Sequence, residues 1–282
     1  MSVAEAPIAL DRRRTAFDGQ TALDTLRGRV EATRFVPGRA ARVTVPEVPL
    51  TRTPTGGADK ALLHGEPVTV ISESAGRAFV QSGWDAYVGY VDPAALGDPA
   101  ETTHHLVAPS SHLYPEPHFK SPPLQGLSLG SGLAGRGLRD GFLETPDGFV
   151  PLQHVVERDA PKPILETALS LVGTPYLWGG NSAFGTDCSG LVQLACRLAG
   201  HTCPRDSDQQ AAELGTALPE GAALQPADVI CWKGHVGLMV DAETLLHANI
   251  HHMAVAIEPL NAALKRIASH EFGEVTSIRR LP

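Results

Sequence analysis

Hydrophobic and polar positions follow two different patterns, and the change falls near residue 160. Before it, short apolar runs alternate with Gly and Pro, and long helical periodicity is scarce. Runs this short are typical of strands in small all-β barrels. The runs that predict strands are residues 41–45, 67–72, 78–81 and 86–91.

After residue 160, helical spacing comes first and strand-like runs follow. A first helix is predicted over residues 164–172, and a Gly-rich loop covers residues 173–185. A second helix is predicted over residues 189–199, because its apolar positions follow i, i+3, i+4, i+7 spacing and Gly200 stops it. Strand-like runs follow at 228–232, 235–240, 245–248, 254–258 and 275–279. Helices followed by an antiparallel sheet predict an α+β fold for residues 160–282.

The first 40 residues carry a weaker pattern. Residues 21–32 could form a short helix, and residues 12–17 could be disordered. Packing of residues 1–40 on the first barrel is one possibility, and their role stays open.

Charge and composition exclude several classes of partner. The chain has 282 residues and a net charge of −8, and its longest Lys/Arg cluster is residues 12–14. Nucleic acids and anionic membranes both require concentrated positive charge, so neither is an expected partner. No run approaches the roughly 18 apolar residues of a membrane span. The N-terminus does not read as a secretory signal, so we expect a cytoplasmic protein.

The cysteines and histidines do not predict a metal site. The four cysteines lie at 188, 196, 203 and 231, and no CxxC motif occurs. A cytosolic setting also disfavours disulfides. The histidines at 104–105 and at 251–252 are adjacent in sequence, so the two side chains of each pair would point to opposite faces of a strand. We expect neither a metal nor another cofactor.

The stretch GTDCSGLVQLAC raises the question of a nucleophile. Cys188 lies where the Gly-rich loop meets a helix start, and a helix N-terminus stabilises a thiolate. A lowered thiol pKa would give fast iodoacetamide labelling near pH 6. The alternative is an inert buried cysteine, which is the more common role of a free thiol.

A nucleophilic cysteine needs a base, and the base needs an orienting group. His235, in WKGHVGLMV, is the candidate base, and His247, in LLHAN, is the candidate third group. The two can share a sheet face only if the turn near residues 241–244 has an odd residue count, or if a bulge intervenes.

Residues 65–96, GEPVTVISESAGRAFVQSGWDAYVGYVDPAAL, resemble a bacterial SH3-like domain. Residues 104–158 repeat the plan less clearly and end in DGFVPLQHV. The resemblance implies two SH3-like barrels in tandem, over residues 41–98 and 99–158.

Residues 162–282 resemble the NlpC/P60 family of cysteine peptidases, which cut cell-wall peptides and have a papain-like core. The resemblance rests on PYLWGGNSAFGTDCSG, GHVG and HAN in that order. It implies that Cys188 is the nucleophile, His235 the base and His247 its orienting partner. It also implies that Tyr176 and backbone N–H groups near Cys188 hold the oxyanion.

The motifs CPRDSDQQ and HANIHHMAVAIEPL are similar to those of γ-D-glutamyl-L-diamino acid endopeptidases (dipeptidyl-peptidase VI-like). These enzymes join SH3-like barrels to the NlpC/P60 domain, act in the cytosol in murein peptide recycling, and require a free N-terminal L-Ala. The first barrel walls off the cleft, so a short peptide is the implied substrate. The residues implied to bind it are Trp178, Asp187, Ser189, Asp206 and Ser207, with Glu66 and Tyr87 from the first barrel.

Several of these residues have a simpler alternative role. Asp187 could only cap the second helix, and Asp206 with Ser207 could cap the next one. Glu66 could be a solvated turn residue, and Trp178 could belong to the core.

Two other functions also remain open. One is an amidase or acyltransferase acting on another small γ-glutamyl or acyl substrate. The other is a module that binds wall peptides without cutting them. The sequence does not say whether the diamino acid is lysine or meso-diaminopimelate, and it does not give the oligomeric state.

Overall fold

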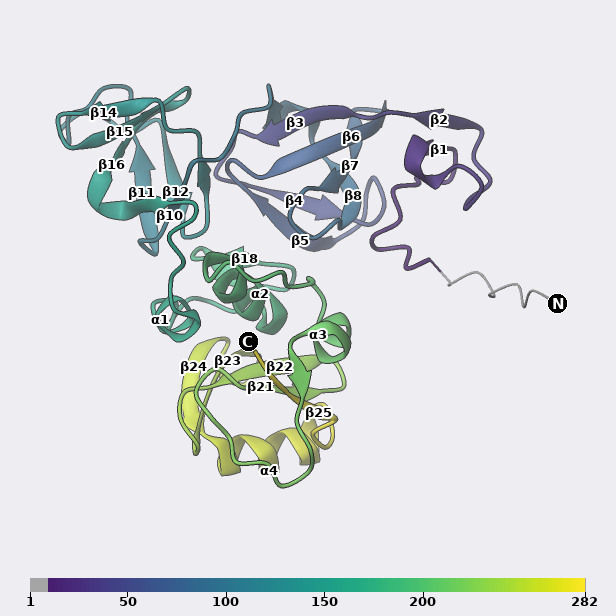
Figure 1. Ribbon diagram of the computed structural model, residues 1–282, viewed down its shortest axis with the longest axis vertical. Helices are drawn as coiled ribbons and strands as arrows, with labels where there is room; N and C mark the ends of the chain where they lie inside the picture. The colour runs from purple at the N-terminus through teal and green to yellow at the C-terminus, as the bar shows by residue number, and fades with distance from the viewer. Residues whose placement is uncertain (1–9, 282) are drawn as a thin grey trace.

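The computed structural model describes residues 10–281, which form three consecutive regions (Figure 1). Purple and blue strands form a first β region, teal strands a second one, and green to yellow elements a C-terminal α+β region. Among the described residues, no helix has the length and apolar character needed to cross a bilayer.

The first β region is one antiparallel sheet of seven strands in the order β5-β4-β8-β7-β6-β3-β9. Its register shifts between Val70 and Ser72, an irregularity of the kind that lets a sheet bend around its own core. That core contains Leu50, Leu62 and Val80, each fully buried. The strands are β3 (Arg39–Val43), β4 (Glu47–Thr51), β5 (Ala58–Leu63), β6 (Pro67–Ser74), β7 (Arg77–Ser82), β8 (Val88–Val91) and β9 (Leu96–Gly97).

The segment before this sheet packs on it. Strands β1 (Thr21–Leu23) and β2 (Arg34–Val36) pair in parallel, and only Asp24–Leu26 between them form one 3₁₀ turn. The prediction of a helix over residues 21–32 is therefore wrong. Leu23 and Leu26 instead pack against Ile71 and Phe79 of the barrel. Residues 1–9 lie outside the described residues.

The second β region consists of three small sheets around a separate core. Leu106, Leu127 and Leu133 are among its fully buried side chains. Arg42 of the first region forms two 2.8 Å bonds to Asp147, which join the two regions. The strands are β10 (His104–Leu106), β11 (Ser110–Leu113), β12 (Gln125–Ser128), β13 (Gly132–Leu133), β14 (Gly137–Arg139), β15 (Phe142–Thr145), β16 (Gly148–Pro151) and β17 (Val155–Glu157).

The C-terminal region has a six-stranded antiparallel sheet in the order β20-β25-β21-β22-β23-β24, which confirms the predicted α+β fold. One face packs on α2, and the other packs on α4 (Figure 1). The strands are β20 (Thr216–Ala217), β21 (Val229–Trp232), β22 (His235–Met239), β23 (Thr244–Asn249), β24 (Ala254–Pro259) and β25 (Ser277–Arg280), with a separate hairpin of β18 (Asn181–Ser182) and β19 (Gly185–Thr186).

The helices follow the sequence pattern only in part. The helices are α1 (Ile164–Leu169), α2 (Cys188–Leu198), α3 (Ser207–Glu213) and α4 (Leu260–His270). The predicted second helix is confirmed as α2, whereas α1 ends earlier than predicted. Helix α4 was not predicted, although Leu260, Ala263 and Ile267 are spaced i, i+3, i+7 and bury one face.

A buried ion cluster lies between the first β region and α2. The ammonium of Lys60 binds Glu66 at 3.0 Å and Asp85 at 2.8 Å, and all three side chains are almost completely buried. Asp85 also accepts a 2.8 Å bond from the Gln193 amide of α2. The cluster therefore links the barrel to the helix that begins at Cys188.

Candidate active site

A cavity of about 670 Å³ opens between the first β region and the C-terminal region. Its lining combines the N-terminal segment, the barrel, the loop before α2 and the start of α3. The lining residues used below are Asp11, Arg13, Asp59, Tyr87, Tyr176, Trp178, Asp187, Cys188, Ser189, Arg205, Asp206, Ser207 and Asp208.

Cys188 is the first residue of α2 and is 7% exposed. Burial raises the pKa of its thiol to about 12, and the nearby Asp187 raises it too. The backbone N–H groups of Val236 and Ser189 act in the opposite direction but do not outweigh burial. The expectation of a lowered thiol pKa is therefore wrong for this state, and Cys188 rests as a thiol.

The two candidate histidines share a face of the sheet. Val240 and Thr244 pair across the turn, which leaves three residues between them, so the odd count needed for a shared face is confirmed. His235 Nε2 and His247 Nδ1 lie 2.8 Å apart. Gly237 makes room for this contact, since a Cβ there would lie 3.0 Å from the Cβ of His247.

His235 is held in a tight apolar setting at the start of β22. Its ring stacks on Phe272 with centroids 5.0 Å apart. Burial, together with the neighbouring His247 and Arg266, lowers the pKa of His235 to about 3, so the ring is neutral. Within residues 10–281 no hydrogen bond joins His235 to the thiol, and in resting enzymes such bonds often form only once substrate binds.

The two aromatic residues of the PYLW motif open onto the cavity. Burial raises the pKa of Tyr176, and the nearby Cys188 raises it as well, so the phenol stays protonated and can donate. Trp178 is 71% exposed, so the alternative of a core tryptophan is wrong.

Asp187 caps α2, as the simpler alternative predicted. Its Oδ1 accepts a 2.8 Å bond from the Gly190 N–H, and its Oδ2 accepts one of 2.8 Å from the Gly179 N–H. Arg205, 1% exposed, binds both oxygens at 2.9 and 2.6 Å and Ser189 Oγ at 2.8 Å. A ligand ammonium could reach Asp187 only by displacing one of these partners.

Asp206 lies at the N-cap position of α3 but makes no capping bond with its side chain. Its Oδ2 accepts a 2.8 Å bond from Arg13 and a 3.1 Å bond from the Tyr87 hydroxyl. Ser207 follows as the first residue of α3 and also lines the cavity. The structure thus brings Tyr87, Asp206 and Ser207 together on one wall.

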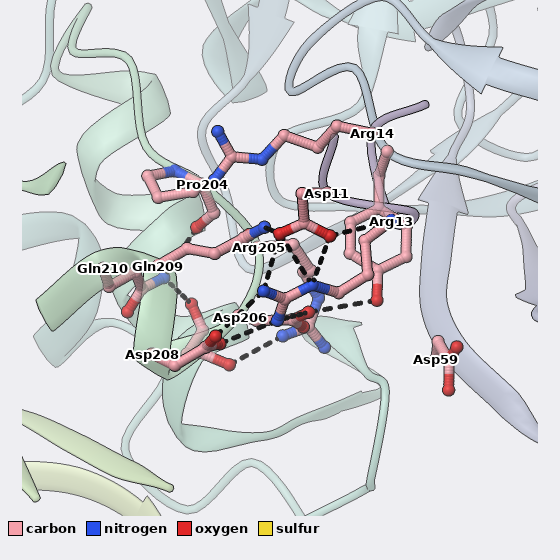
Figure 2. Close-up of polar contacts among 12 residues, drawn as sticks. Asp11, Arg13, Arg14, Asp59, Pro204, Arg205, Asp206, Asp208, Gln209 and Gln210 are labelled. Atoms are coloured by element: carbon pink, nitrogen blue, oxygen red, sulfur yellow. Dashed lines mark hydrogen bonds and ion pairs between the residues drawn. The ribbon is translucent and has the colours of Figure 1, made fainter. Parts of the chain in front are cut away.

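Arg13 belongs to a segment that we call the N-terminal strap, residues 11–14. Figure 2 shows its guanidinium between three carboxylates, those of Asp11, Asp206 and Asp208. Arg14 binds Glu213 of α3 at 2.6 Å. The Arg13 carbonyl accepts a 2.8 Å bond from Val88 of the barrel, so the strap connects the barrel to α3.

Glu66 does not reach the cavity. It is fully buried in the ion cluster with Lys60, so neither the expected contact with an ammonium nor the solvated-turn alternative agrees with its position. Asp59, on β5, is the barrel carboxylate that lines the cavity, and it is paired with Arg52 at 2.9 Å. Sequence reasoning missed it because barrel loop lengths vary.

No metal site is evident in the described part of the chain. Residues 10–281 contain no group of three or more His, Cys, Asp or Glu side chains able to hold a metal ion. All four cysteines are buried free thiols.

A buried thiol at a helix N-terminus and a neutral imidazole oriented by a third polar group define the cysteine hydrolase class of site. Comparisons with known proteins agree with that class. Residues 173–270 match the NlpC/P60 family, and residues 50–96 match the bacterial dipeptidyl-peptidase SH3 domain. Residues 173–270 therefore form an NlpC/P60 domain, and residues 50–96 form a bacterial SH3 domain that precedes it.

Curated relatives match part of their length. A γ-D-glutamyl-L-lysine dipeptidyl-peptidase of Bacillus cereus is 33% identical over 43% of this chain and 38% of its own length. Dipeptidyl-peptidase 6 of Lysinibacillus sphaericus is 34% identical over 39% of this chain and 40% of its own length. A probable endopeptidase of Mycobacterium bovis is 31% identical over 46% of this chain and 34% of its own length. The matched segments thus span only about a third to two fifths of these relatives.

A solved structure matches over more of the chain. The crystal structure of an NlpC/P60 family protein from Bacillus cereus aligns with a TM-score of 0.73. It covers 86% of this chain and 100% of that one, at 20% identity. The likeness extends the shared fold beyond the catalytic region into the β regions.

Proposed function

We propose that the protein is a cysteine endopeptidase that hydrolyses the γ-D-Glu–diamino acid bond of murein peptides with a free N-terminal L-Ala. The carrying observation is the position of Cys188, which lines the same cavity as Asp206 and Tyr87. A primary ammonium binds best where several acceptors converge in a partly dry pocket. The name of the Bacillus cereus relative, a γ-D-glutamyl-L-lysine dipeptidyl-peptidase, agrees with a γ-glutamyl substrate.

The proposed reaction follows from the resting protonation states. His235 accepts the thiol proton as Cys188 Sγ attacks the γ-carbonyl carbon, and Tyr176 with a backbone N–H binds the oxyanion. Collapse breaks the C–N bond, and His235 returns the proton to the leaving amine. Water then hydrolyses the thioester, releasing L-Ala-γ-D-Glu and the free thiol. The chemistry calls for no cofactor.

The architecture that we propose for this enzyme has two SH3-like barrels, over residues 41–98 and 99–158, before a papain-like core over residues 160–282. The first barrel and the N-terminal strap line the cavity beside Cys188, which favours a short peptide over intact wall. Work on short peptides fits a role in cytoplasmic recycling, which stays a prediction.

Mass spectrometry of the products tests the proposal. The substrates are L-Ala-γ-D-Glu-diaminopimelate, its lysine counterpart, and the N-acetylated form of each. We expect cleavage of the free-amine peptides alone, and no cleavage by Cys188→Ala. Cleavage of the acetylated peptides would support the peptidase activity but contradict the proposed ammonium-binding pocket. Cleavage of no peptide by the parent enzyme would favour the amidase, acyltransferase or binding-module alternatives.

A further inference from the structure

A chain of polar contacts continues past the third group of the site. His247 Nε2 lies 2.7 Å from Glu258 Oε1. Arg266 of α4 donates to both oxygens of the same carboxylate, at 2.7 Å each. Glu258 is 9% exposed, so the contact is well protected from water.

The strand register creates this contact. His247 of β23 pairs directly with Ala256 of β24, and Glu258 lies two residues further along the same face. Glu258 stands near the end of β24, just before α4, and Arg266 follows within that helix. An acid in an otherwise apolar strand is thereby placed between a histidine and an arginine.

The direction of each hydrogen bond follows from Glu258. Burial raises the pKa of this carboxyl, but the bonds from Arg266 and His247 outweigh it and hold the pKa well below its usual range. An ionised carboxylate only accepts, so His247 Nε2 must donate. Neutral His247 then accepts at Nδ1, and His235 must donate to it from Nε2. His235 keeps a lone pair at Nδ1, its remaining ring nitrogen.

We propose that Glu258, held by Arg266, is a positioning residue that sets the tautomers of His247 and His235 so that His235 Nδ1 can accept the thiol proton. The inference rests on the proposed function in that Cys188 and His235 carry the reaction. A glutamine cannot replace the acid. Arg266 donates toward both oxygen positions, so the amide NH₂ would face a donor whichever way it turned.

The chain offers a matched control. Arg266 also binds Glu271 Oε1 at 3.1 Å, and within residues 10–281 no hydrogen bond joins Glu271 to His235 or His247. Glu258→Gln and Glu271→Gln therefore make the same chemical change at two carboxylates of one arginine. Glu258→Asp gives a second measurement, because it retains the charge but shortens the reach.

The test combines kinetics with ¹⁵N NMR of the histidine rings in the full chain. For Glu258→Gln we expect kcat to fall by on the order of 10- to 100-fold at nearly constant KM, as for other groups that orient a functional histidine. For Glu271→Gln we expect kcat within about 2-fold of the parent, and for Glu258→Asp an intermediate loss. NMR should show His247 with its proton on Nε2 in the parent and a changed proton distribution in Glu258→Gln.

Equal losses in the two Gln variants, or an unchanged His247 tautomer in Glu258→Gln, would overturn the inference. If Glu258→Gln does not fold, Glu258→Asp decides instead. An unchanged kcat in Glu258→Asp together with altered histidine tautomers would overturn the inference as well. The NMR readout needs no substrate. Failure of the parent to cleave the murein peptides would therefore count against the proposed function, while the tautomers still decide the role of Glu258.

Discussion

Arg205 is the buried cation on which the start of the catalytic helix depends, and its removal gives a sharp prediction. The change Arg205→Met retains much of the side-chain volume but removes four hydrogen bonds, to both oxygens of Asp187, to Ser189 and to the Gly180 carbonyl. Asp187, 6% exposed, would remain as a buried charge that accepts bonds only from two backbone N–H groups and, at 3.3 Å, from the Ser189 hydroxyl. Loss of one partner of a buried pair costs about 3–5 kcal/mol, which is the expected loss of unfolding free energy.

The double variant Arg205→Met with Asp187→Asn separates the charge from the packing. Asn is also a good N-cap residue, so the bond to the Gly190 N–H can persist. Since no uncompensated charge remains, we expect the double variant to recover about half of the stability that Arg205→Met loses. Urea unfolding followed by circular dichroism gives both values.

The same variants should change the reactivity of the thiol. Burial raises the pKa of Cys188, Asp187 raises it further, and Arg205 lowers it. Iodoacetamide should therefore label Cys188 more slowly in Arg205→Met than in the parent at the same pH, and faster again in the double variant. Peptide mass spectrometry follows Cys188 separately from the other cysteines. For stability, a loss of unfolding free energy below about 1 kcal/mol in Arg205→Met would refute the reasoning. A double variant that is no more stable than Arg205→Met would refute it as well.

Three further predictions concern the cleft. Labelling of parent Cys188 should be slow at pH 6 and rise steadily toward high pH, because burial raises the pKa of the thiol to about 12; a plateau already reached at pH 6 would contradict this. Arg13→Ala should raise KM for the free-amine peptide several-fold with little change in kcat, because burial raises the pKa of Asp206 and Arg13 helps to lower it; Arg14→Ala, which removes the contact with Glu213 instead, is the control and should leave KM unchanged. Gly237→Ala should lower kcat at least 10-fold by displacing His247, since the new Cβ would lie 3.0 Å from the histidine Cβ and 2.9 Å from Leu245; activity close to that of the parent would show that the strand pair can yield.

The sequence pattern correctly predicted features that depend on residues close together in the chain. The helix after Cys188 followed from apolar spacing and Gly200, and the shared face of the two histidines followed from the parity of one turn. The family motifs placed Tyr176 and Trp178 at the cavity because each lies close in sequence to the nucleophile.

Other features depended on contacts between distant segments. Glu66 and Asp59 are seven residues apart on the barrel, and only the fold decides which one is buried with Lys60 and which one lines the cavity. The thiol pKa was predicted in the wrong direction because the helix N-terminus was considered without the burial that opposes it. Arg205 and Glu258 lay inside the recognised motifs, but a spacing alone does not show what a charged residue will face.

The N-terminal strap has a consequence for the order in which the enzyme becomes complete during translation. Arg13 and Arg14 bond to residues of α3 that follow them by 193 to 199 positions. The barrel and the strap therefore emerge from the ribosome long before their partners on α3, and contacts between such distant residues are slow to form. Cys188, His235 and the strap can meet only after synthesis has passed residue 235. A nascent chain that stops short of His235 therefore has an incomplete candidate site.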